Sequence, residues 1–359
     1  MKGPFAFFDG HEQVVYGADG ETGMRCIIAV HSTALGPSLG GTRFYPYDTE
    51  EEALVDALRL SSAMTYKAAC AGLDLGGGKA VILGDPATTK SEPLLRAYGR
   101  LVESLNGRYI TACDVGTYPR DMEIVARECR WVTGMDEAHG GSGDSGIMTA
   151  YGVLVALQAL ADALWRDENL SGRHVAIQGL GKVGSRLASH LAQAGAKLTV
   201  TDVNLEAVDR VVTESGAEVV EPEEVYDVEA DILSPNALGG TLNERTIPRL
   251  RVAAVCGGAN NQLATLGDAD RLRERGVVYA PDFVVNVGGL VQVADELLPG
   301  GYSPQRARAK TREIGGTLRQ VLSLAHHLGA TTEAAARRLA EQRIAAVGRL
   351  RRFHLRPTS

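Results

Sequence analysis

Three glycines followed by a lysine, Gly76-Gly77-Gly78-Lys79, form the most distinctive group of residues in the sequence. Glycines allow close backbone approach or positive φ, and the apolar run Ala80–Leu83 that follows is typical of a strand. A lysine held in so crowded a site is a candidate base or nucleophile. The alternative is a tight turn that ends in a solvated lysine.

Two further polar residues are candidates for the same chemistry. Lys67 lies near the end of an expected helix, and Asp114 follows the strand-like run Tyr109–Cys113. Two lysines in one pocket would favour a neutral amine on one of them, while the other could bind a carboxylate. Lys67 could instead only complement a helix dipole. The eight histidines form no metal motif, so we expect no metal site.

A dinucleotide-binding fingerprint lies in the second half of the chain. Gly179, Gly181 and Gly184 follow an expected strand and open an expected helix, and Asp202 ends the next strand. In this pattern the glycines admit a pyrophosphate, and the acidic residue binds ribose hydroxyls, which favours NAD over NADP. The alternative is an ordinary glycine-rich turn.

Two amide-rich segments, Cys256–Gln262 and Ala280–Gly289, also follow expected strands. Ligands of open α/β sheets bind at the carboxyl ends of strands, so these segments are candidate binding loops. Asx turns would explain the same residues.

The elements that must position these residues alternate between strands and helices, which predicts an α/β fold. We expect strands at 24–31 and 197–201, a turn-rich segment at 35–43, and a turn at 76–79. Helices are expected from about 50 to 70 and from 119 to 129, and a hinge loop at 134–146. A βαβ series from 173 onward predicts a mostly parallel, doubly wound sheet. The expected domains are a substrate-binding and oligomerisation domain (1–135), a Rossmann-type NAD-binding domain (136–330) with a cleft between the two, and a C-terminal helical segment (331–359) that packs back on the first domain.

Composition narrows the function classes. The 359 residues carry a net charge of −7, which gives no reason to expect nucleic acid or a membrane as a partner. The five cysteines are widely spaced, and no secretory leader is evident, so we expect a cytoplasmic protein. The apolar stretch Met148–Trp165 is interpreted as a buried helix, and the arginines near the C-terminus, including Arg351 and Arg352, as a solvated face.

Taken together, these motifs resemble the leucine/phenylalanine/valine dehydrogenase family of amino-acid dehydrogenases, with the valine dehydrogenases as the most similar branch. The resemblance covers roughly residues 11 to 350. The segments that carry it are LGPSLGGTRFYPYDTEEEA (35–53), MTYKAACAGLDLGGGKAVILGDP (64–86), GRYITACDVGT (107–117), QGLGKVG (178–184), VTDVN (200–204), GGANNQLA (257–264) and YAPDFVVNVGG (279–289).

The resemblance implies a role for each matching residue. Lys79 and Asp114 would be catalytic, and Lys67 would bind the substrate carboxylate. Other substrate-binding residues would be Leu39, Gly40, Ala112, Asn261, Leu290 and Val293, of which the four apolar ones line the side-chain pocket. The NAD-binding residues would be Thr149, Gly179, Gly181, Lys182, Val183, Gly184, Asp202 and Asn260. Three residues, Asn236, Gly258 and Val287, depart from the family pattern within the expected cofactor domain.

The implied reaction is reversible NAD-dependent oxidative deamination of an aliphatic L-amino acid to a 2-oxo acid and ammonia. Valine or leucine is the favoured substrate. A phenylalanine dehydrogenase and a non-catalytic NAD-binding regulatory protein are the alternatives. A homo-oligomer, either a dimer or an octamer, is expected.

Overall fold

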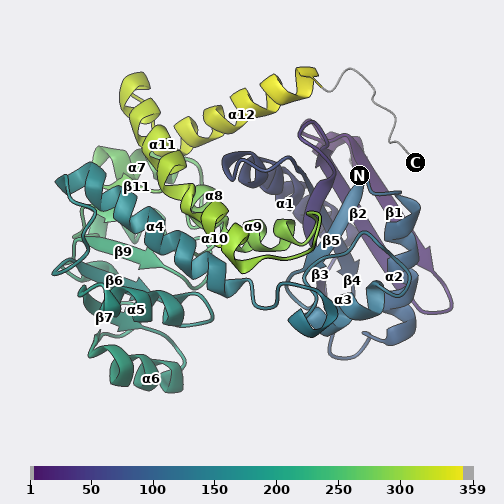
Figure 1. Cartoon of the computed structure of the whole chain (residues 1–359), viewed down its shortest axis with the longest axis horizontal. Coiled ribbons are helices and arrows are strands. Elements are labelled where there is room, and N and C mark those ends of the chain that lie inside the picture. The colour runs from purple at the N-terminus through teal and green to yellow at the C-terminus, as the bar shows by residue number, and fades with distance from the viewer. Residues whose placement is uncertain (1–3, 351–359) are drawn as a thin grey trace. The chain divides into compact units, whose positions relative to one another are not determined.

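The computed structural model describes residues 4–350, which divide into two compact units (Figure 1). Within these residues, unit 1 comprises 4–144, 293–303 and 340–350, and unit 2 comprises 145–292 and 304–339. Arg351 and Arg352, and part of the expected C-terminal segment, lie outside the described residues.

Unit 1 contains a five-stranded mixed sheet in the order β1-β2-β4-β3-β5. Its strands are β1 (Gln13–Asp19), β2 (Met24–Ser32), β3 (Ser38–Tyr45), β4 (Gly76–Leu83) and β5 (Tyr109–Cys113). β1 and β2 are antiparallel, as are β2 and β4, whereas β3 runs parallel to both β4 and β5. The parallel arrangement places the carboxyl ends of β3, β4 and β5 at one edge of the sheet.

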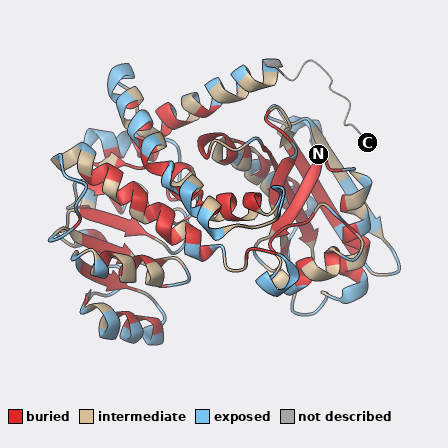
Figure 2. Ribbon diagram, in the orientation of Figure 1, coloured by how far each residue is buried: buried red, intermediate tan, exposed pale blue. Residues whose placement is uncertain are grey.

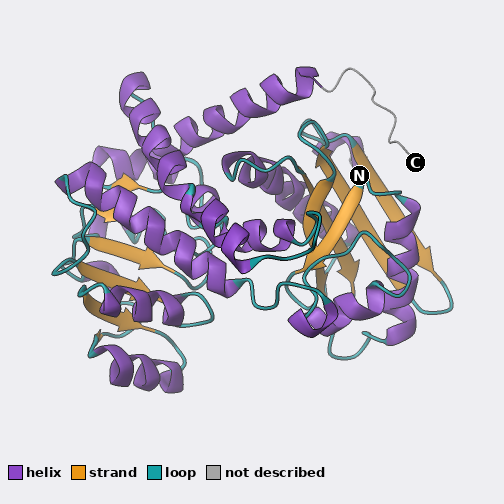
Figure 3. Ribbon diagram, viewed as in Figure 1, coloured by secondary structure: helices purple, strands orange, loops and turns teal. Residues whose placement is uncertain are grey.

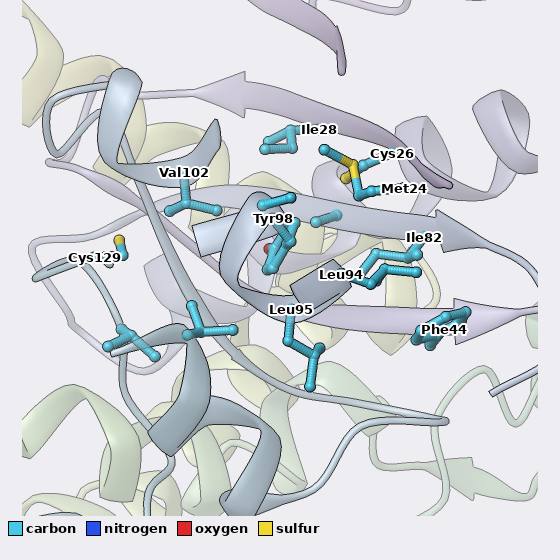
Figure 4. Packing of buried hydrophobic residues seen from close by; sticks show 14 of the residues in the cluster. Met24, Cys26, Ile28, Phe44, Ile82, Leu94, Leu95, Tyr98, Val102 and Cys129 are labelled. Carbon is cyan, nitrogen blue, oxygen red and sulfur yellow. The ribbon is translucent and has the colours of Figure 1, made fainter. Parts of the chain in front are cut away.

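Helices cover both faces of this sheet (Figure 3). α1 (Glu50–Cys70) packs with Ile27, Ala29 and Val81 on one face. α2 (Glu92–Ser104) and α3 (Pro119–Val125) cover the other face, where the larger core of the unit lies (Figure 4). α1 begins at Glu50 because Thr49 caps it, accepting a hydrogen bond from the Glu52 amide at 3.1 Å.

Unit 2 contains a parallel six-stranded sheet in the order β11-β10-β9-β6-β7-β8. The strands are β6 (His174–Gln178), β7 (Lys197–Thr201), β8 (Glu218–Val219), β9 (Ile232–Pro235), β10 (Ala254–Val255) and β11 (Val278–Tyr279). The strand order reverses between β6 and β9, which is the topological switch point of a doubly wound fold. The predicted Rossmann-type sheet is therefore confirmed.

Nine helices are assigned after residue 145, in the part of the chain that the structure describes. They are α4 (Gly146–Trp165), α5 (Gly184–Gln193), α6 (Leu205–Ser215), α7 (Gly267–Glu274), α8 (Asp282–Val285), α9 (Gly288–Asp295), α10 (Pro304–Arg312), α11 (Ile314–Leu328) and α12 (Thr332–Leu350). α4 is long and apolar enough to cross a membrane by length and composition alone, but much of it is buried within the unit (Figure 2). It packs against α5, α10 and α11, as the core helix of a globular unit does.

Three sequence expectations are corrected. The segment at 35–43, expected to be turn-rich, contains most of β3, and Gly76–Lys79 is the first half of β4 instead of a turn. The helix expected to run from 119 to 129 ends at Val125. Glycine-rich sequence was interpreted as turns because the chain gives no sign that neighbouring strands would fill the space beside each glycine.

The compact units also differ from the expected domain bounds. Val293–Ser303 belongs to unit 1, where Glu296 accepts hydrogen bonds from the amides of Gly134 and Ser142, each at 3.0 Å. α12 passes from unit 2 to unit 1 after Leu339. Its second half bonds to unit 1 through Arg343, which contacts Asp74 at 2.9 Å.

Candidate active site

Lys79 lies in the middle of β4, a strand with a neighbour on each side. β4 lies between β2 and β3, and the Lys79 side chain is buried. A Cβ on Gly77 would lie 2.2 Å from the amide nitrogen of Thr65 on α1, and one on Gly78 would lie 2.6 Å from the Tyr109 ring. The glycines therefore make room for the protein's own helix and tyrosine.

The Lys79 ammonium forms an ion pair with the Asp114 carboxylate and donates a hydrogen bond to its Oδ2. Asp114 directly follows β5, so the two residues come from strands separated by β3. Gly41 lies on β3 between them, opposite Ala112 of β5. A Cβ on Gly41 would lie 2.8 Å from the Asp114 Cβ, so the lack of a side chain there lets the pair form.

Asp114 is held by a second cation and by its own loop. The Arg43 Nε donates to Oδ2 at 3.3 Å, and the Asp114 amide donates to Thr117 Oγ1 at 2.9 Å. Burial alone would raise the pKa of Asp114, but Lys79 and then Arg43 outweigh it, so the pKa lies below its usual value. Asp114 is therefore a carboxylate at neutral and alkaline pH.

Arg43 is a site residue that the sequence analysis missed. It lies on β3, and its Nη1 donates to Asp56 Oδ2 of α1 at 2.7 Å. The Tyr47 hydroxyl donates to the same oxygen at 2.6 Å. A signal was available in Thr42-Arg43-Phe44-Tyr45, since three of these four residues are β-branched or aromatic, as is typical of strands.

Lys67 lies in the last turn of α1. Thr65 of α1 lies beside Gly77 of β4, and Lys67 and Lys79 each follow one of these two residues by two positions. The partner that the structure gives to Lys79 is Asp114. The expectation that Lys67 tunes Lys79 stays a prediction.

The remaining expected substrate residues are divided between the units. Leu39, Gly40, Ala112 and Val293 lie in unit 1, while Asn261 and Leu290 lie in unit 2. Gly40 is buried, and its carbonyl accepts a 2.6 Å hydrogen bond from the Tyr109 hydroxyl. Asn261 is exposed and adopts a left-handed conformation with φ of 52°.

The glycine fingerprint fits a bound dinucleotide. Gly179 adopts a φ of 92° at the end of β6, and a Cβ on Gly184 would lie 1.9 Å from the Gly179 carbonyl oxygen. Apart from Gly181 and its two chain neighbours, no atom of the described residues lies within 4 Å of the place where a Gly181 Cβ would be, so the backbone there is open to a phosphate group. Asp202 braces this loop by accepting the amide hydrogens of Leu180 at 2.5 Å and Asn204 at 2.8 Å.

Other expected cofactor residues lie on elements around this loop. Lys182 and Val183 lie within the fingerprint, and Thr149 lies in the first turn of α4. Asn260 accepts a 2.8 Å hydrogen bond from Asn286, which connects the two amide-rich segments. Sequence analysis did not anticipate this bond.

Two of the three departures from the family pattern contact each other. Asn236 Oδ1 accepts a hydrogen bond from the Gly258 amide at 2.9 Å, and a Cβ on Gly258 would lie 2.9 Å from the same oxygen. Asn236 therefore suits a glycine at position 258. The third departure, Val287, is buried.

The fold, the Lys79–Asp114 pair of unit 1 and the glycine fingerprint of unit 2 together define a class of protein. It is the class of two-unit dehydrogenases with a Rossmann-type dinucleotide-binding unit. The chain matches two family descriptions: "Glu/Leu/Phe/Val dehydrogenase, dimerisation domain" over residues 11–131, and "Glutamate/Leucine/Phenylalanine/Valine dehydrogenase" over 140–204 and 199–351. It belongs to this family and is an amino-acid dehydrogenase.

Individual relatives agree with this assignment. A valine dehydrogenase of Streptomyces virginiae is 52% identical, covering 93% of this chain and 94% of that protein. A leucine dehydrogenase of Bacillus cereus is 50% identical, covering 96% and 94%. Among solved structures, the crystal structure of L-tryptophan dehydrogenase from Nostoc punctiforme is similar, with a TM-score of 0.83 and 43% identity, covering 94% of this chain and 97% of that one.

Proposed function

We propose that the protein catalyses the reversible NAD-dependent oxidative deamination of an aliphatic L-amino acid, with valine or leucine as the favoured substrate. The ion pair of the buried Lys79 with the part-buried Asp114, in a chain of this family, carries the proposal. The products are the 2-oxo acid, ammonium, NADH and one proton, and one water molecule is consumed.

Three polar residues of unit 1, Lys67, Lys79 and Asp114, have distinct tasks in the proposed reaction. Lys67 binds the substrate carboxylate, and Asp114 exchanges protons with the amino group. Lys79 takes a proton from the water that attacks the imine carbon. The Lys79–Asp114 pair must therefore rearrange when substrate binds, because a lysine that acts as a base needs a free lone pair.

When bound, NAD supplies the acceptor for the hydride that leaves the substrate Cα. The open backbone at Gly181, with Lys182 and Val183, would hold its pyrophosphate. Asp202 would bind the adenosine ribose, since each carboxylate oxygen can accept a further hydrogen bond beside its backbone partner. Thr149 and Asn260 would bind the nicotinamide end.

The choice of substrate rests on the apolar residues Leu39, Ala112, Leu290 and Val293. None of them offers a charge to a glutamate side chain, so glutamate should be a poor substrate. Relatives named for valine and leucine support an aliphatic substrate, while the resemblance to a tryptophan dehydrogenase keeps an aromatic substrate such as phenylalanine as the second candidate. One methylene in such a pocket is worth only about 1–3 kcal/mol.

The test is the rise in absorbance at 340 nm when purified protein and NAD meet L-valine, L-leucine, L-isoleucine, L-phenylalanine or L-glutamate at alkaline pH. We expect turnover with the aliphatic substrates and a near-complete loss in Lys79→Ala, which should still bind NADH. Lys197→Ala, which removes a lysine from an exposed ion pair with Glu218, is the matched control and should keep full activity. A protein inactive on all five substrates but able to bind NADH would instead fit the non-catalytic regulatory alternative.

We also propose that the protein is a cytoplasmic homo-oligomer. Its five cysteines are free, as expected in a reducing compartment. The description of the family's N-terminal region as a dimerisation domain supports self-association.

A further inference from the structure

The side chain next to Asp114 that no assigned role explains is Arg43. We propose that Arg43 is a positioning residue that holds the Asp114 carboxylate ionised and oriented while Lys79 acts as the base. This inference rests on the proposed function of the Lys79–Asp114 pair.

Arg43 bridges two carboxylates from different elements. Its Nε contacts Asp114 Oδ2 at 3.3 Å, and its Nη1 contacts Asp56 Oδ2 of α1 at 2.7 Å. The Tyr47 hydroxyl donates to the same Asp56 oxygen at 2.6 Å. Because these partners fix both ends of the guanidinium, Arg43 has little freedom to leave Asp114.

The burial of these groups makes the contact electrostatically significant. The side chains of Arg43 and Asp114 are each 24% exposed, and that of Asp56 is 13% exposed. Charges that are partly removed from water interact more strongly than charges on an open surface. The Arg43–Asp114 contact therefore differs from an ordinary surface ion pair.

The groups that face Asp114 include two cations and several neutral groups. Lys79 approaches from β4 and Arg43 from β3, while Cys113, the Val115 amide and Thr117 belong to its own strand and loop. Asp56 and Tyr47 contact Arg43 from the other side. Burial raises the pKa of both Tyr47 and Cys113, so both side chains stay neutral at the pH of the reaction.

The two cations around Asp114 behave differently during turnover. Lys79 must be neutral when it acts as a base, and at that moment it no longer favours the Asp114 carboxylate. A guanidinium keeps its proton throughout the working pH range. Arg43 is therefore the cation that still holds Asp114 ionised at that step.

A surface groove gives Arg43 one side open to water. The groove has a volume of about 640 Å³, and Arg43, Tyr45, Tyr47, Val55 and Val115 are among the residues that line it. Asp56 and Arg59 line it as well.

Arg59 also pairs with Asp56, at 3.4 Å, but its side chain is 66% exposed. Arg59 is the matched control. It shares the Asp56 partner with Arg43 but, among residues 4–350, forms no ion pair with Asp114.

The test compares the pH profiles of kcat/KM for the wild type, Arg43→Met, Arg43→Lys and Arg59→Met. The acid limb reports the protonation of the Lys79–Asp114 pair as a coupled unit, so loss of the Arg43 charge beside that pair should move the limb to higher pH. A shift of one unit would lower kcat/KM about tenfold on that limb and leave the alkaline plateau within about threefold. Arg43→Lys should shift the limb less, because it keeps the charge and loses the fork, and Arg59→Met should match the wild type.

A folded Arg43→Met protein with the wild-type profile would overturn the inference, and so would an equal shift in Arg59→Met. If Arg43→Met does not fold, Arg43→Lys and Asp56→Asn decide in the same way. An inactive wild type would refute the proposed function instead. The inference on Arg43 is then decided by the carboxyl ¹³C resonance of Asp114, assigned by its absence in Asp114→Asn, whose titration midpoint should rise in Arg43→Met.

Discussion

At the residue scale, the site depends on a part-buried ion pair that is costly to maintain. Removing an ammonium and a carboxylate from water costs several kcal/mol per ion, and their attraction repays this only with good geometry and further partners. Asp114 has these partners in Arg43 and in its own loop. Such an arrangement is typical of functional sites, where charged groups are kept ready for proton transfer.

Gly41 provides a test of how closely that pair must be held. In Gly41→Ala the new Cβ would lie 2.5 Å from the Cys113 carbonyl oxygen and 2.8 Å from the Asp114 Cβ, so β5 or Asp114 must move. Because a displacement of about 1 Å in a catalytic group can cost about 100-fold in rate, we expect a fall of that order in kcat. Steady-state kinetics measure it, and circular dichroism checks the fold.

Gly20→Ala is the control for this substitution, since no atom lies within 4 Å of the place where its Cβ would be. It should leave both kcat and stability unchanged. A folded Gly41→Ala protein with wild-type kcat would show that the space between Lys79 and Asp114 is not needed for catalysis.

At the element scale, β3 brings the site together. It lies between β4 and β5 and carries both Gly41 and Arg43. Arg43 in turn donates a hydrogen bond to Asp56 of α1. In unit 2 the loop after β9 has a similar role, because Ala237 packs against Gly179 of the fingerprint. Changes in that loop should therefore reach the cofactor site.

The contact between Asn236 and Gly258 makes this expectation testable. Gly258→Ala would place a Cβ 2.8 Å from Val183 and 2.9 Å from Asn236 Oδ1, and we expect it to weaken NADH binding several-fold. Asn236→Ala removes that oxygen and should restore part of the affinity in the double variant. Fluorescence titration with NADH would measure a coupling of about 0.5–3 kcal/mol, the range for residues in contact.

Gly267→Ala in the same unit is the control, since the nearest atom to its Cβ would be 3.7 Å away. Additive effects of Asn236→Ala and Gly258→Ala would contradict the coupling. The two departures from the family pattern would then be independent of each other.

At the scale of the whole molecule, each unit has its own sheet and core. Unit 1 also exposes several large side chains that a monomer would leave in water. They are Tyr16 of the edge strand β1, Tyr45, Val115 and Tyr118, each about half exposed or more. The family model that matches residues 11–131, in the same unit, is described as a dimerisation domain, which supports a role for this unit in self-association.

We therefore expect self-association in solution. Size-exclusion chromatography with light scattering should give a multiple of the 38.1 kDa chain mass, with a dimer or an octamer as the expected states. The measured mass should stay the same when the protein is diluted to micromolar concentration, because a stable interface buries the exposed side chains of unit 1. A single species of 38.1 kDa at that concentration would contradict the expectation.

The sequence by itself determined the class of fold, the family and the residues of the fingerprint. These properties depend on local patterns: β7 was expected at its observed bounds, Lys197–Thr201, and Gly179, Gly181 and Gly184 lie where a strand meets a helix. Residue types and their spacing carry this information because they follow the geometry of a single strand, turn or helix.

Only the tertiary structure decided what surrounds Lys79. Gly76–Gly78 were expected in a turn and lie in a strand, because Thr65, Tyr109 and other residues far apart in the sequence fill the space beside them. Arg43 meets Asp114 across 71 residues of sequence for the same reason. Strand pairing sets such contacts, and a single sequence does not record which strands become neighbours.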